Sequence, residues 1–247
     1  MQQDKMRLDL ALVERGLVAT RARAQAAIKA GQVRLRGQVA SKPSEMVAAD
    51  EDVEFSAPDR AYVSRGALKL LHALDVFSLD PSGLACLDLG ASTGGFTQVL
   101  LERGAAQVVA IDVGHGQLAK ELAGNPHVRS VEGLNARDLT RELVPENFSF
   151  ITADLSFIGL RKALPPALAL AERNAHLVAL IKPQFEAGPQ NVGKGGIVRD
   201  PEIHERICGD ISRWLEDEMK WQVLGVTPSP IEGGDGNREF LIAARKT

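Results

Sequence analysis

Four charged residues lie beside apolar segments of the sequence, where an unpaired charge would carry a desolvation cost. Lys182 follows the apolar run LVALI, and Asp154 follows the run FSFITA. Lys69 lies in the amphipathic segment SRGALKLLHAL, and Glu239 lies at the start of the segment REFLI. A lysine can take a proton from a hydroxyl once burial and a neighbouring ammonium lower its pKa, whereas carboxylates hold a lysine in place and raise its pKa. The set therefore has the composition of an alkoxide-forming site; a buried salt bridge and ordinary surface charges are the competing interpretations.

Alternating strand and helix patterns must position these four residues. Short apolar runs predict five strands, over residues 84–90, 106–114, 127–133, 148–157 and 176–183. A helical pattern over residues 94–104 lies between the first two of these strands, and another over residues 201–220 follows the fifth. The segments WQVLGVTPSP and REFLIAAR predict a final pair of strands. This order predicts an α/β fold with a doubly wound, Rossmann-like sheet that is parallel at least through its first half. Ligands of such sheets bind beyond the carboxyl ends of the strands, where Asp154 and Lys182 are expected.

A glycine-rich loop follows the first of these strands. Residues 88–97 read DLGASTGGFT, and small residues there let the backbone approach a ligand beside the start of a helix. Asp112 ends the second strand about 20 residues downstream, where an acid can accept the hydroxyls of a ribose. The spacing differs from the GxGxxG pattern and leaves no good pyrophosphate cradle, so it favours a ligand without phosphate, such as S-adenosylmethionine. A structural turn followed by a surface aspartate is the alternative.

The composition excludes several classes of protein. The 247-residue chain is 45% hydrophobic and 25% charged, with a net charge of −3, which is ordinary for a globular protein. Its two cysteines, Cys86 and Cys208, lack metal-ligand spacing, so we expect neither a disulfide-built fold nor a metal site. We find no signal peptide and no apolar run of roughly 18 residues. We therefore predict a cytoplasmic protein without membrane association.

Basic charge is concentrated near the start of the chain. Residues 1–43 hold nine lysines and arginines against three acids, whereas residues 44–59 hold six acids and no lysine or arginine. RLDLALVERGLV and TRARAQAAIKAGQV predict two short helices, the second with Thr20 as its N-cap, and VRLRGQV predicts a hairpin. From charge alone, a binder of phosphate backbones and a solvated charged face are about equally consistent. The residues that we expect to contact RNA are Arg7, Arg21, Arg23, Lys29, Arg34 and Arg36.

This basic stretch resembles the small RNA-binding domain shared by a small-subunit ribosomal protein, bacterial tyrosyl-tRNA synthetases and many pseudouridine synthases. The matching features are the Gly-Leu-Val that ends the first helix, the Thr-Arg step before the second, and the two Gly-x-Val steps of the hairpin. The resemblance implies docking on structured RNA. We predict an α+β RNA-binding domain over residues 1–58, a linker over residues 59–64 and a catalytic domain over residues 65–247.

Six motifs spread over nearly the whole chain resemble those of the TlyA family, ribosomal RNA 2′-O-methyltransferases that are often named haemolysins. In order they read SRGALKL, DLGASTGGFT, VVAIDVGHGQL, ADLSFI, LIKPQFE and GNREFL. The resemblance implies an FtsJ-class catalytic domain, whose Lys-Asp-Lys-Glu tetrad falls on Lys69, Asp154, Lys182 and Glu239 here. In that scheme Lys182 takes the proton of the ribose 2′-hydroxyl, Asp154 and Lys69 orient it, and Glu239 anchors the lysines. No metal is implied.

The resemblance also implies S-adenosylmethionine as the methyl donor. The glycine-rich loop would hold its methionine end, Asp112 its ribose, and Asn135 would lie near its adenine. The expected cofactor-binding residues are Gly90, Ser92, Thr93, Gly94, Phe96, Asp112, Asn135 and Asp154. The family usually reads SFISL where this chain reads SFIGL, so Gly159 replaces a serine, which puts a local helix cap or substrate contact in doubt.

The implied function is methylation of a ribose 2′-hydroxyl, of cytidine, with ribosomal RNA or a ribosomal subunit as the partner. One alternative is a membrane-active protein, as the family's older name suggests, although the sequence offers no strongly apolar amphipathic segment for that role. Another is a non-catalytic RNA-binding factor that kept the fold. The complete set of two lysines and two acids argues against this second alternative.

Overall fold

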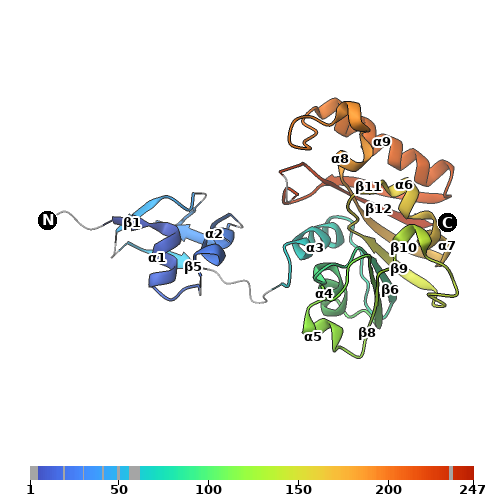
Figure 1. Ribbon diagram of the computed structural model, residues 1–247, viewed down its shortest axis with the longest axis horizontal. Helices are drawn as coiled ribbons and strands as arrows, with labels where there is room; N and C mark the ends of the chain where they lie inside the picture. The colour runs from blue at the N-terminus through green and yellow to red at the C-terminus, as the bar shows by residue number, and fades with distance from the viewer. Residues whose placement is uncertain are drawn as a thin grey trace. The chain divides into compact units, whose positions relative to one another are not determined.

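The chain divides into two compact units. The computed structural model describes residues 5–18, 20–29, 31–40, 42–48, 51–55, 62–233 and 236–247. The units are Met1–Ala61 and Tyr62–Thr247 (Figure 1). Each has a hydrophobic core of its own. Residues 59–61 of the predicted linker lie outside the described residues, and residues 62–64 belong to the larger unit. The predicted domain limits remain a prediction.

The smaller unit packs two short helices against short antiparallel strands. Its elements are β1 (Lys5–Arg7), α1 (Leu8–Glu14), α2 (Arg21–Lys29), β2 (Val33–Leu35), β3 (Gln38–Val39), β4 (Met46–Ala48) and β5 (Val53–Phe55). The Thr20 hydroxyl accepts a hydrogen bond from Arg23 N at 3.3 Å, which places the predicted N-cap at the start of α2. β1 pairs with β4, and β2 lies between β3 and β5. β4 and β5 fall in the acidic stretch, where three-residue strands leave too short a pattern to predict.

The larger unit is built on a seven-stranded sheet with the order β11-β12-β10-β9-β6-β7-β8. Its strands are β6 (Ala85–Leu89), β7 (Gln107–Asp112), β8 (Val128–Glu132), β9 (Phe148–Ala153), β10 (Ala171–Ile181), β11 (Trp221–Pro228) and β12 (Phe240–Lys246). The first five of these strands are parallel, and β12 pairs antiparallel with both β10 and β11. The predicted Rossmann-like α/β fold with a final pair of strands is confirmed.

Helices cover both faces of this sheet. They are α3 (Gly66–Val76), α4 (Gly95–Glu102), α5 (Lys120–Ala123), α6 (Leu160–Ala163), α7 (Pro165–Ala169), α8 (Pro183–Glu186) and α9 (Pro201–Asp217), with 3-10 turns η1 (Ala136–Asp138) and η2 (Pro189–Asn191). The start of α9 follows the prediction, because Pro201 occupies its first turn and Asp200 caps it by accepting a hydrogen bond from Glu202 N at 2.9 Å.

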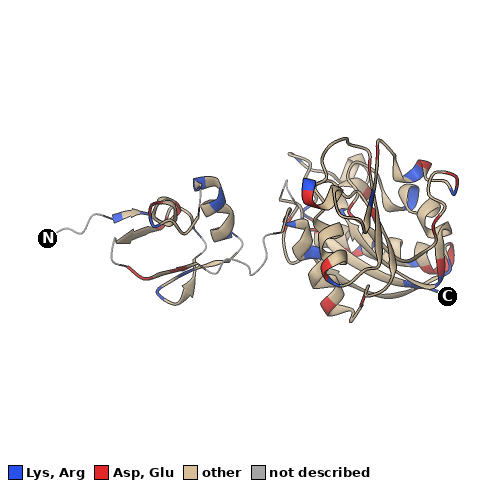
Figure 2. Cartoon of the chain, turned by 90° about the horizontal axis from the view of Figure 1, so that it is seen from below, with Lys and Arg blue, Asp and Glu red and all other residues tan. Residues whose placement is uncertain are grey.

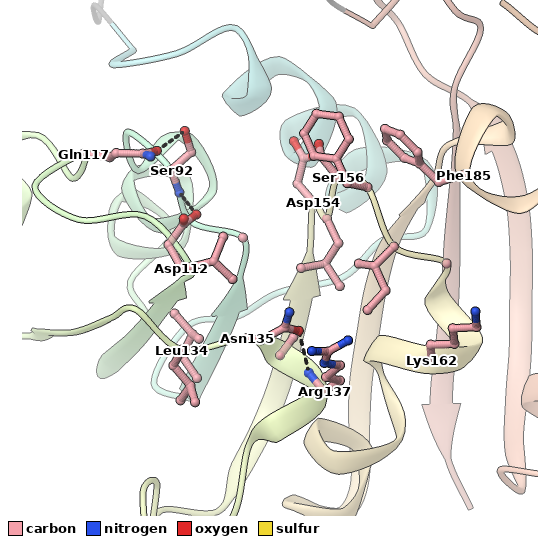
Figure 3. A pocket seen from close by; sticks show the side chains of 18 residues that line it. Ser92, Asp112, Gln117, Leu134, Asn135, Arg137, Asp154, Ser156, Lys162 and Phe185 are labelled. Atoms are coloured by element: carbon pink, nitrogen blue, oxygen red, sulfur yellow. Dashed lines mark hydrogen bonds between the residues drawn. The ribbon is translucent and has the colours of Figure 1, made fainter. Parts of the chain in front are cut away.

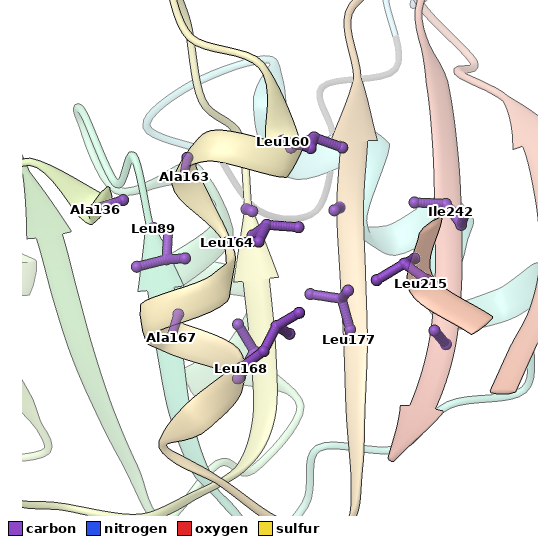
Figure 4. Packing of buried hydrophobic residues seen from close by; sticks show 14 of the residues in the cluster. Leu89, Ala136, Leu160, Ala163, Leu164, Ala167, Leu168, Leu177, Leu215 and Ile242 are labelled. Carbon is purple, nitrogen blue, oxygen red and sulfur yellow. The ribbon is translucent and has the colours of Figure 1, made fainter. Parts of the chain in front are cut away.

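Alternate residues of the strands enter two separate cores. Cys86 of β6 and Phe150 of β9 pack with α3 and α4, whereas Leu87 and Ile151 pack on the opposite face with α6, α7 and α9. Figure 4 shows this second core, where α6 and α7 lie over Leu89 and Leu177 of the sheet. The period of two along each strand therefore creates two buried faces, as the nearly continuous apolar runs require.

β6 lies at the point where the strand order reverses. β7 and β8 extend the sheet on one side of β6, and β9 and β10 extend it on the other. The connections that leave this point in opposite directions open a crevice beyond the carboxyl ends of the strands, where ligands of doubly wound sheets bind. Gly90, Asp112, Asp154 and Lys182 lie at the carboxyl ends of β6, β7, β9 and β10.

Candidate active site

Two lysine–carboxylate pairs lie beside the carboxyl edge of the sheet. Lys182 Nζ is 2.6 Å from Asp154 Oδ1, and Lys69 Nζ is 2.5 Å from Glu239 Oε2. Lys69, Lys182 and Glu239 are buried, with 7%, 9% and 4% of their surfaces exposed. Removal of one partner would leave an uncompensated buried charge, so each lysine depends on its carboxylate. All four residues predicted from the sequence therefore lie in close ion pairs.

Neighbouring strands deliver three of these side chains to one edge. β10 pairs in parallel with β9, so Asp154 and Lys182 follow the same end of two adjacent strands. β12 runs antiparallel to β10, with Phe240 opposite Ile181, so Glu239 precedes β12 where Lys182 follows β10. Lys69 comes from the buried face of α3, which packs on the sheet.

Two cavities adjoin these pairs. The larger, of about 790 Å³, is lined by the strand-end residues Gly90, Asp112 and Asp154, together with Asn135 (Figure 3). The smaller, of about 250 Å³, is lined by Lys69 and by the glycine-rich loop. Gly90 and Asp154 line both cavities, and Lys182 borders them through its ion pair with Asp154.

The glycine-rich loop contributes unequally to these cavities. Gly90 has φ 78°, and a Cβ there would overlap the backbone oxygen of Asp154, so only glycine permits this approach of loop and strand end. Ser92 lines both cavities, and Thr93 and Phe96 line the smaller one. Gly94 lines neither; it precedes α4 at φ 98°, with the side chains of Leu118 and Leu122 close by. Gly94 therefore shapes the turn rather than the cavity wall.

Backbone hydrogen bonds fix Asp112 at the wall of the larger cavity. Asp112 Oδ2 accepts a hydrogen bond from Ser92 N at 2.8 Å, and Oδ1 accepts one from Gly114 N at 2.7 Å. Each carboxylate oxygen keeps a further lone pair for a ligand hydroxyl. Asn135 caps η1, because its Oδ1 accepts a hydrogen bond from Arg137 N at 3.2 Å, and it lines the same cavity (Figure 3). Gln117, which the sequence did not point to, lines the cavity beside Ser92.

Asp88 lies on β6 just before the glycine-rich loop and holds the elements around it together. The sequence did not assign it a role. Asp88 is fully buried on β6, where its oxygens accept hydrogen bonds from Thr97 Oγ1 at 2.7 Å and Thr152 Oγ1 at 2.9 Å. Burial raises the pKa of Asp88 to about 6, and the two hydroxyl hydrogen bonds oppose that rise. The carboxyl group ties α4 and β9 to β6 two residues before Gly90. An acid inside the apolar run LACLDLG was the available signal.

Three further residues complete the other side of the larger cavity. Lys182 Nζ donates a hydrogen bond to Ser156 Oγ at 2.9 Å. Phe157 is 90% exposed at φ 65°, and its ring centroid lies 5.3 Å from that of Phe185. Ser156, Phe157 and Phe185 all line the cavity. The sequence did not reveal these residues, because an aromatic residue after an apolar strand is usually part of the core.

In the smaller unit, Asp9 gathers two of the arginines predicted to bind RNA. Arg7 donates through Nε and Nη2 at 2.9 and 3.0 Å, and Arg21 donates through Nε at 3.0 Å. The Arg7 guanidinium holds the pKa of the Asp9 carboxyl well below its usual range, and hydrogen bonds from Gln25 and Arg21 act in the same direction. The side chains of Arg7 and Arg21 remain 38% and 52% exposed, so both guanidinium groups can meet an anion.

The other four predicted RNA-binding residues lie at the surface of the smaller unit. Arg23 and Lys29 are exposed on α2, which carries basic residues in Figure 2. Arg34 Nη1 donates a hydrogen bond to Gly37 O at 3.1 Å, and Arg36 forms an ion pair with Glu51. The side chains of Arg7, Arg21, Arg34 and Arg36 therefore have partners. Within the described part of the chain, we find no such partner for the side chains of Arg23 and Lys29.

Comparison with known proteins accounts for both units. Residues 62–246 match the model of the FtsJ-like methyltransferase family, and residues 6–53 match that of the S4 domain. The 16S/23S rRNA (cytidine-2′-O)-methyltransferase TlyA of Mycobacterium tuberculosis (strain ATCC 25618 / H37Rv) is 46% identical over 242 residues, which cover 98% of this chain and 90% of that protein. The chain belongs to the TlyA family of FtsJ-like methyltransferases. The TlyA resemblance inferred from the six sequence motifs is confirmed.

Other members of the TlyA family carry a different name. Hemolysin A of Brachyspira hyodysenteriae is 38% identical over 238 residues, which cover 96% of this chain and 98% of that protein. A solved structure from Streptococcus thermophilus with a provisional hemolysin name has 39% identity and a TM-score of 0.74, and covers 99% of this chain and 90% of that one. Within the described residues, we find neither a helix long and apolar enough to cross a membrane nor a metal-binding group of His, Cys, Asp or Glu.

Proposed function

We propose that this chain transfers the methyl group of S-adenosylmethionine to the ribose 2′-hydroxyl of a cytidine in ribosomal RNA. One observation carries the proposal: the Lys182 ammonium lies 2.6 Å from Asp154 Oδ1 and 2.9 Å from Ser156 Oγ, two residues that line the cavity at the carboxyl edge of the sheet. The relative from Mycobacterium tuberculosis is named for the same reaction.

The residues of the larger cavity fit S-adenosylmethionine. The Asp112 carboxylate is fixed at the wall with lone pairs free for ribose hydroxyls, and Ile111, Val113 and Leu134 offer apolar surface for an adenine ring. Gly90 and Ser92 would hold the methionine end, beside Asp154. When bound, S-adenosylmethionine supplies a methyl group activated by its sulfonium.

Lys182 is the proposed base for the acceptor hydroxyl. In its neutral form the amine takes the proton of the 2′-hydroxyl, and Asp154 and Ser156 aim the nitrogen. Lys69, held by Glu239, brings a second positive charge to the smaller cavity, which Asp154 also lines, and so offsets part of the carboxylate's field. A lysine suits this role, because an arginine in its place would not release its proton. Positioning of the hydroxyl supplies much of the remaining rate.

Phe157 offers a stacking surface for the acceptor nucleotide. A nucleotide must leave its stack before its ribose can enter a cavity, and exposed bases are commonly held on aromatic side chains. The Phe157 ring is almost fully exposed three residues after Asp154 and contacts Phe185 on one side. A base stacked on it would gain about 1–3 kcal/mol.

The smaller unit is the proposed docking module for structured RNA. Its Arg7–Asp9–Arg21 cluster presents two guanidinium groups in a fixed arrangement, and guanidinium groups bind phosphates through paired hydrogen bonds. Arg23 and Lys29 add positive charge on α2. Contacts of this kind anchor RNA without reading its sequence, so the choice of nucleotide rests with the larger unit.

The proposal is tested by methyl transfer to purified ribosomal subunits and free rRNA. The wild type should incorporate label from methyl-labelled S-adenosylmethionine at a 2′-O position, mapped by resistance of the adjacent phosphodiester to alkali. Lys182→Ala should lose this activity while keeping its affinity for RNA. Lys120→Ala is the matched control, because Lys120 is exposed on α5. An inactive wild type, or label at a base rather than a ribose, would refute the proposal.

A further inference from the structure

The acceptor loop, residues 154–159 between β9 and α6, carries Asp154, Ser156 and Phe157 of the proposed site. It contains no helix or strand, and Phe157 has φ 65°, a conformation that is rare for a bulky side chain. Such a backbone persists only where surrounding contacts determine it. The contacts of this loop therefore decide where the proposed catalytic groups lie.

The first half of the acceptor loop is held by the segment that follows β10. Lys182 Nζ contacts both Asp154 Oδ1 and Ser156 Oγ, at 2.6 and 2.9 Å. The rings of Phe157 and Phe185 pack at 5.3 Å between centroids. In the second half of the loop, Ile158 packs against the core on that face of the sheet, and the start of α6 needs a further hydrogen-bond acceptor for its first amide.

Glu186, at the end of α8, supplies that acceptor. Its Oε1 accepts a hydrogen bond from Leu160 N, the first residue of α6, at 2.7 Å. Burial raises the pKa of Glu186, and this hydrogen bond opposes the rise, so the amide helps to keep a half-buried carboxylate charged. Glu186 is only four residues from Lys182, so one short segment holds both halves of the acceptor loop.

Gly159 makes this approach possible. It is the N-cap of α6 and has no side chain to cap the helix. A Cβ at Gly159 would lie 2.9 Å from Glu186 Oε2 and 3.4 Å from Phe185 O, so a larger residue would press against the carboxylate. Gly159 replaces the family's serine, which put a cap of this helix in doubt. The start of α6 is nevertheless capped, and the cap is the Glu186 side chain at the end of α8.

We propose that Glu186 is a positioning residue for methyl transfer. It fastens the second half of the acceptor loop to the segment that carries Lys182, and so fixes Asp154, Ser156 and Phe157 relative to the proposed base. This inference rests on the proposed function. It goes beyond the tetrad, because the Glu186 carboxylate acts through its hydrogen bond with the amide of Leu160.

The test compares three substitutions in the full-length protein. Glu186→Ala removes the acceptor and Glu186→Asp withdraws it by one methylene, so both should lower kcat on ribosomal RNA at least tenfold. The KM for S-adenosylmethionine should change less than kcat, because the glycine-rich loop and Asp112 are untouched and only Asp154 is shared with the acceptor loop. Glu186→Gln keeps an oxygen acceptor and should remain within threefold of the wild type. Adding Gly159→Ser to Glu186→Ala should restore part of the loss, since a serine caps the helix itself.

Hydrogen exchange of the amides of residues 155–160 gives a readout that does not need activity. Glu186→Ala and Glu186→Asp should speed this exchange about tenfold, and Glu186→Gln should not. A Glu186→Ala protein that retains kcat within threefold, or equal losses in the Ala and Gln variants, would overturn the inference. If the wild type transfers no methyl group, the proposed function fails, and unchanged exchange in the Ala and Asp variants would separately overturn the positioning role.

Discussion

Among the described residues, each unit buries one aspartate completely, and the two aspartates have different partners. Asp9 of the smaller unit accepts hydrogen bonds from two guanidinium groups and an amide, and its pKa is held well below the usual range. Asp88 of the larger unit accepts hydrogen bonds from two hydroxyls, and its pKa is raised to about 6. Loss of solvent exposure therefore does not by itself set the charge of a carboxyl group: at Asp88 burial outweighs the two hydroxyl hydrogen bonds, whereas at Asp9 the hydrogen bonds from the guanidinium groups outweigh burial.

The two lysine–carboxylate pairs of the proposed active site extend this comparison. At Asp9 the cations are arginines, which stay charged and keep 38% and 52% of their side chains exposed, an arrangement suited to binding an anion. At Asp154 and Glu239 the cations are lysines, whose side chains are only 10% and 9% exposed and which can give up a proton. In the proposed function, the ion pairs of the larger unit place an amine that can act as a base, and those of the smaller unit present permanent positive charge.

The largest expected effect comes from replacing a lysine of the larger unit by the cation of the smaller one. Lys182→Arg keeps the positive charge beside Asp154 but cannot take a proton, so kcat should fall by about a thousandfold. RNA affinity, measured by filter binding, should change less than threefold. Retention of a tenth or more of the activity would mean that Lys182 only neutralises Asp154, as the arginines do at Asp9.

Asp88→Asn should change how stability depends on pH. Because the folded-state pKa of Asp88, about 6, lies above its unfolded value near 4, wild-type stability is favoured at low pH and declines as the pH rises between about 4 and 6. Asparagine removes the cost of ionising a buried carboxyl group. Between pH 4 and pH 6, the free energy of unfolding of the variant should therefore rise relative to that of the wild type by up to about 3 kcal/mol. Urea unfolding at pH 4 and pH 7 measures the difference, and Glu121→Gln, at an exposed acid, is the control. A constant difference between the two pH values would contradict the prediction.

Asp9→Asn should show the opposite pH dependence. The folded-state pKa of Asp9 is lowered. Its contribution to the free energy of unfolding is therefore present when the pH is above the unfolded-state pKa near 4, and it is lost as the pH falls below that value. The substitution should destabilise the smaller unit by roughly 1–3 kcal/mol at pH 7, through weakened charged hydrogen bonds, and by less at pH 3. Urea unfolding followed by circular dichroism checks this. The contrast with Asp88 fails if the loss is equal at both pH values.

The smallest effect should distinguish free from paired arginines within the smaller unit. Arg23→Ala should weaken RNA binding severalfold and reduce the salt dependence of log Kd by about one unit, because one phosphate contact is lost. Arg36→Ala should have a smaller effect, since Arg36 is already paired with Glu51. Binding measured from 50 to 200 mM salt compares the two. Equal slopes for both variants would show that the ion pair opens on RNA.

Much of the fold could be predicted because its signals are local. The apolar runs that became β6, β7 and β9 are long and nearly continuous, and turns or helix caps bound them. β4 and β5 could not be predicted, because three residues carry no readable period and pairing partners alone stabilise them. At the site, Asp112, Asp154 and Lys182 could be singled out because each stands at the carboxyl end of a buried strand. Ser156 and Glu186 could not, because a serine or glutamate in a loop carries no signal of its contacts.

The sequence by itself determined which residues stand at strand ends, because hydrophobic period and chain-breaking residues encode strands locally. The tertiary structure alone decided the partners. Lys69 pairs with Glu239 across 170 positions, Lys182 contacts Ser156 across 26, and Glu186 caps α6 across the same separation. These choices depend on strand order and register, which arise when the two faces of the sheet are buried together. Local pattern therefore supplies the chemical groups of the proposed site, and packing of distant segments sets their geometry.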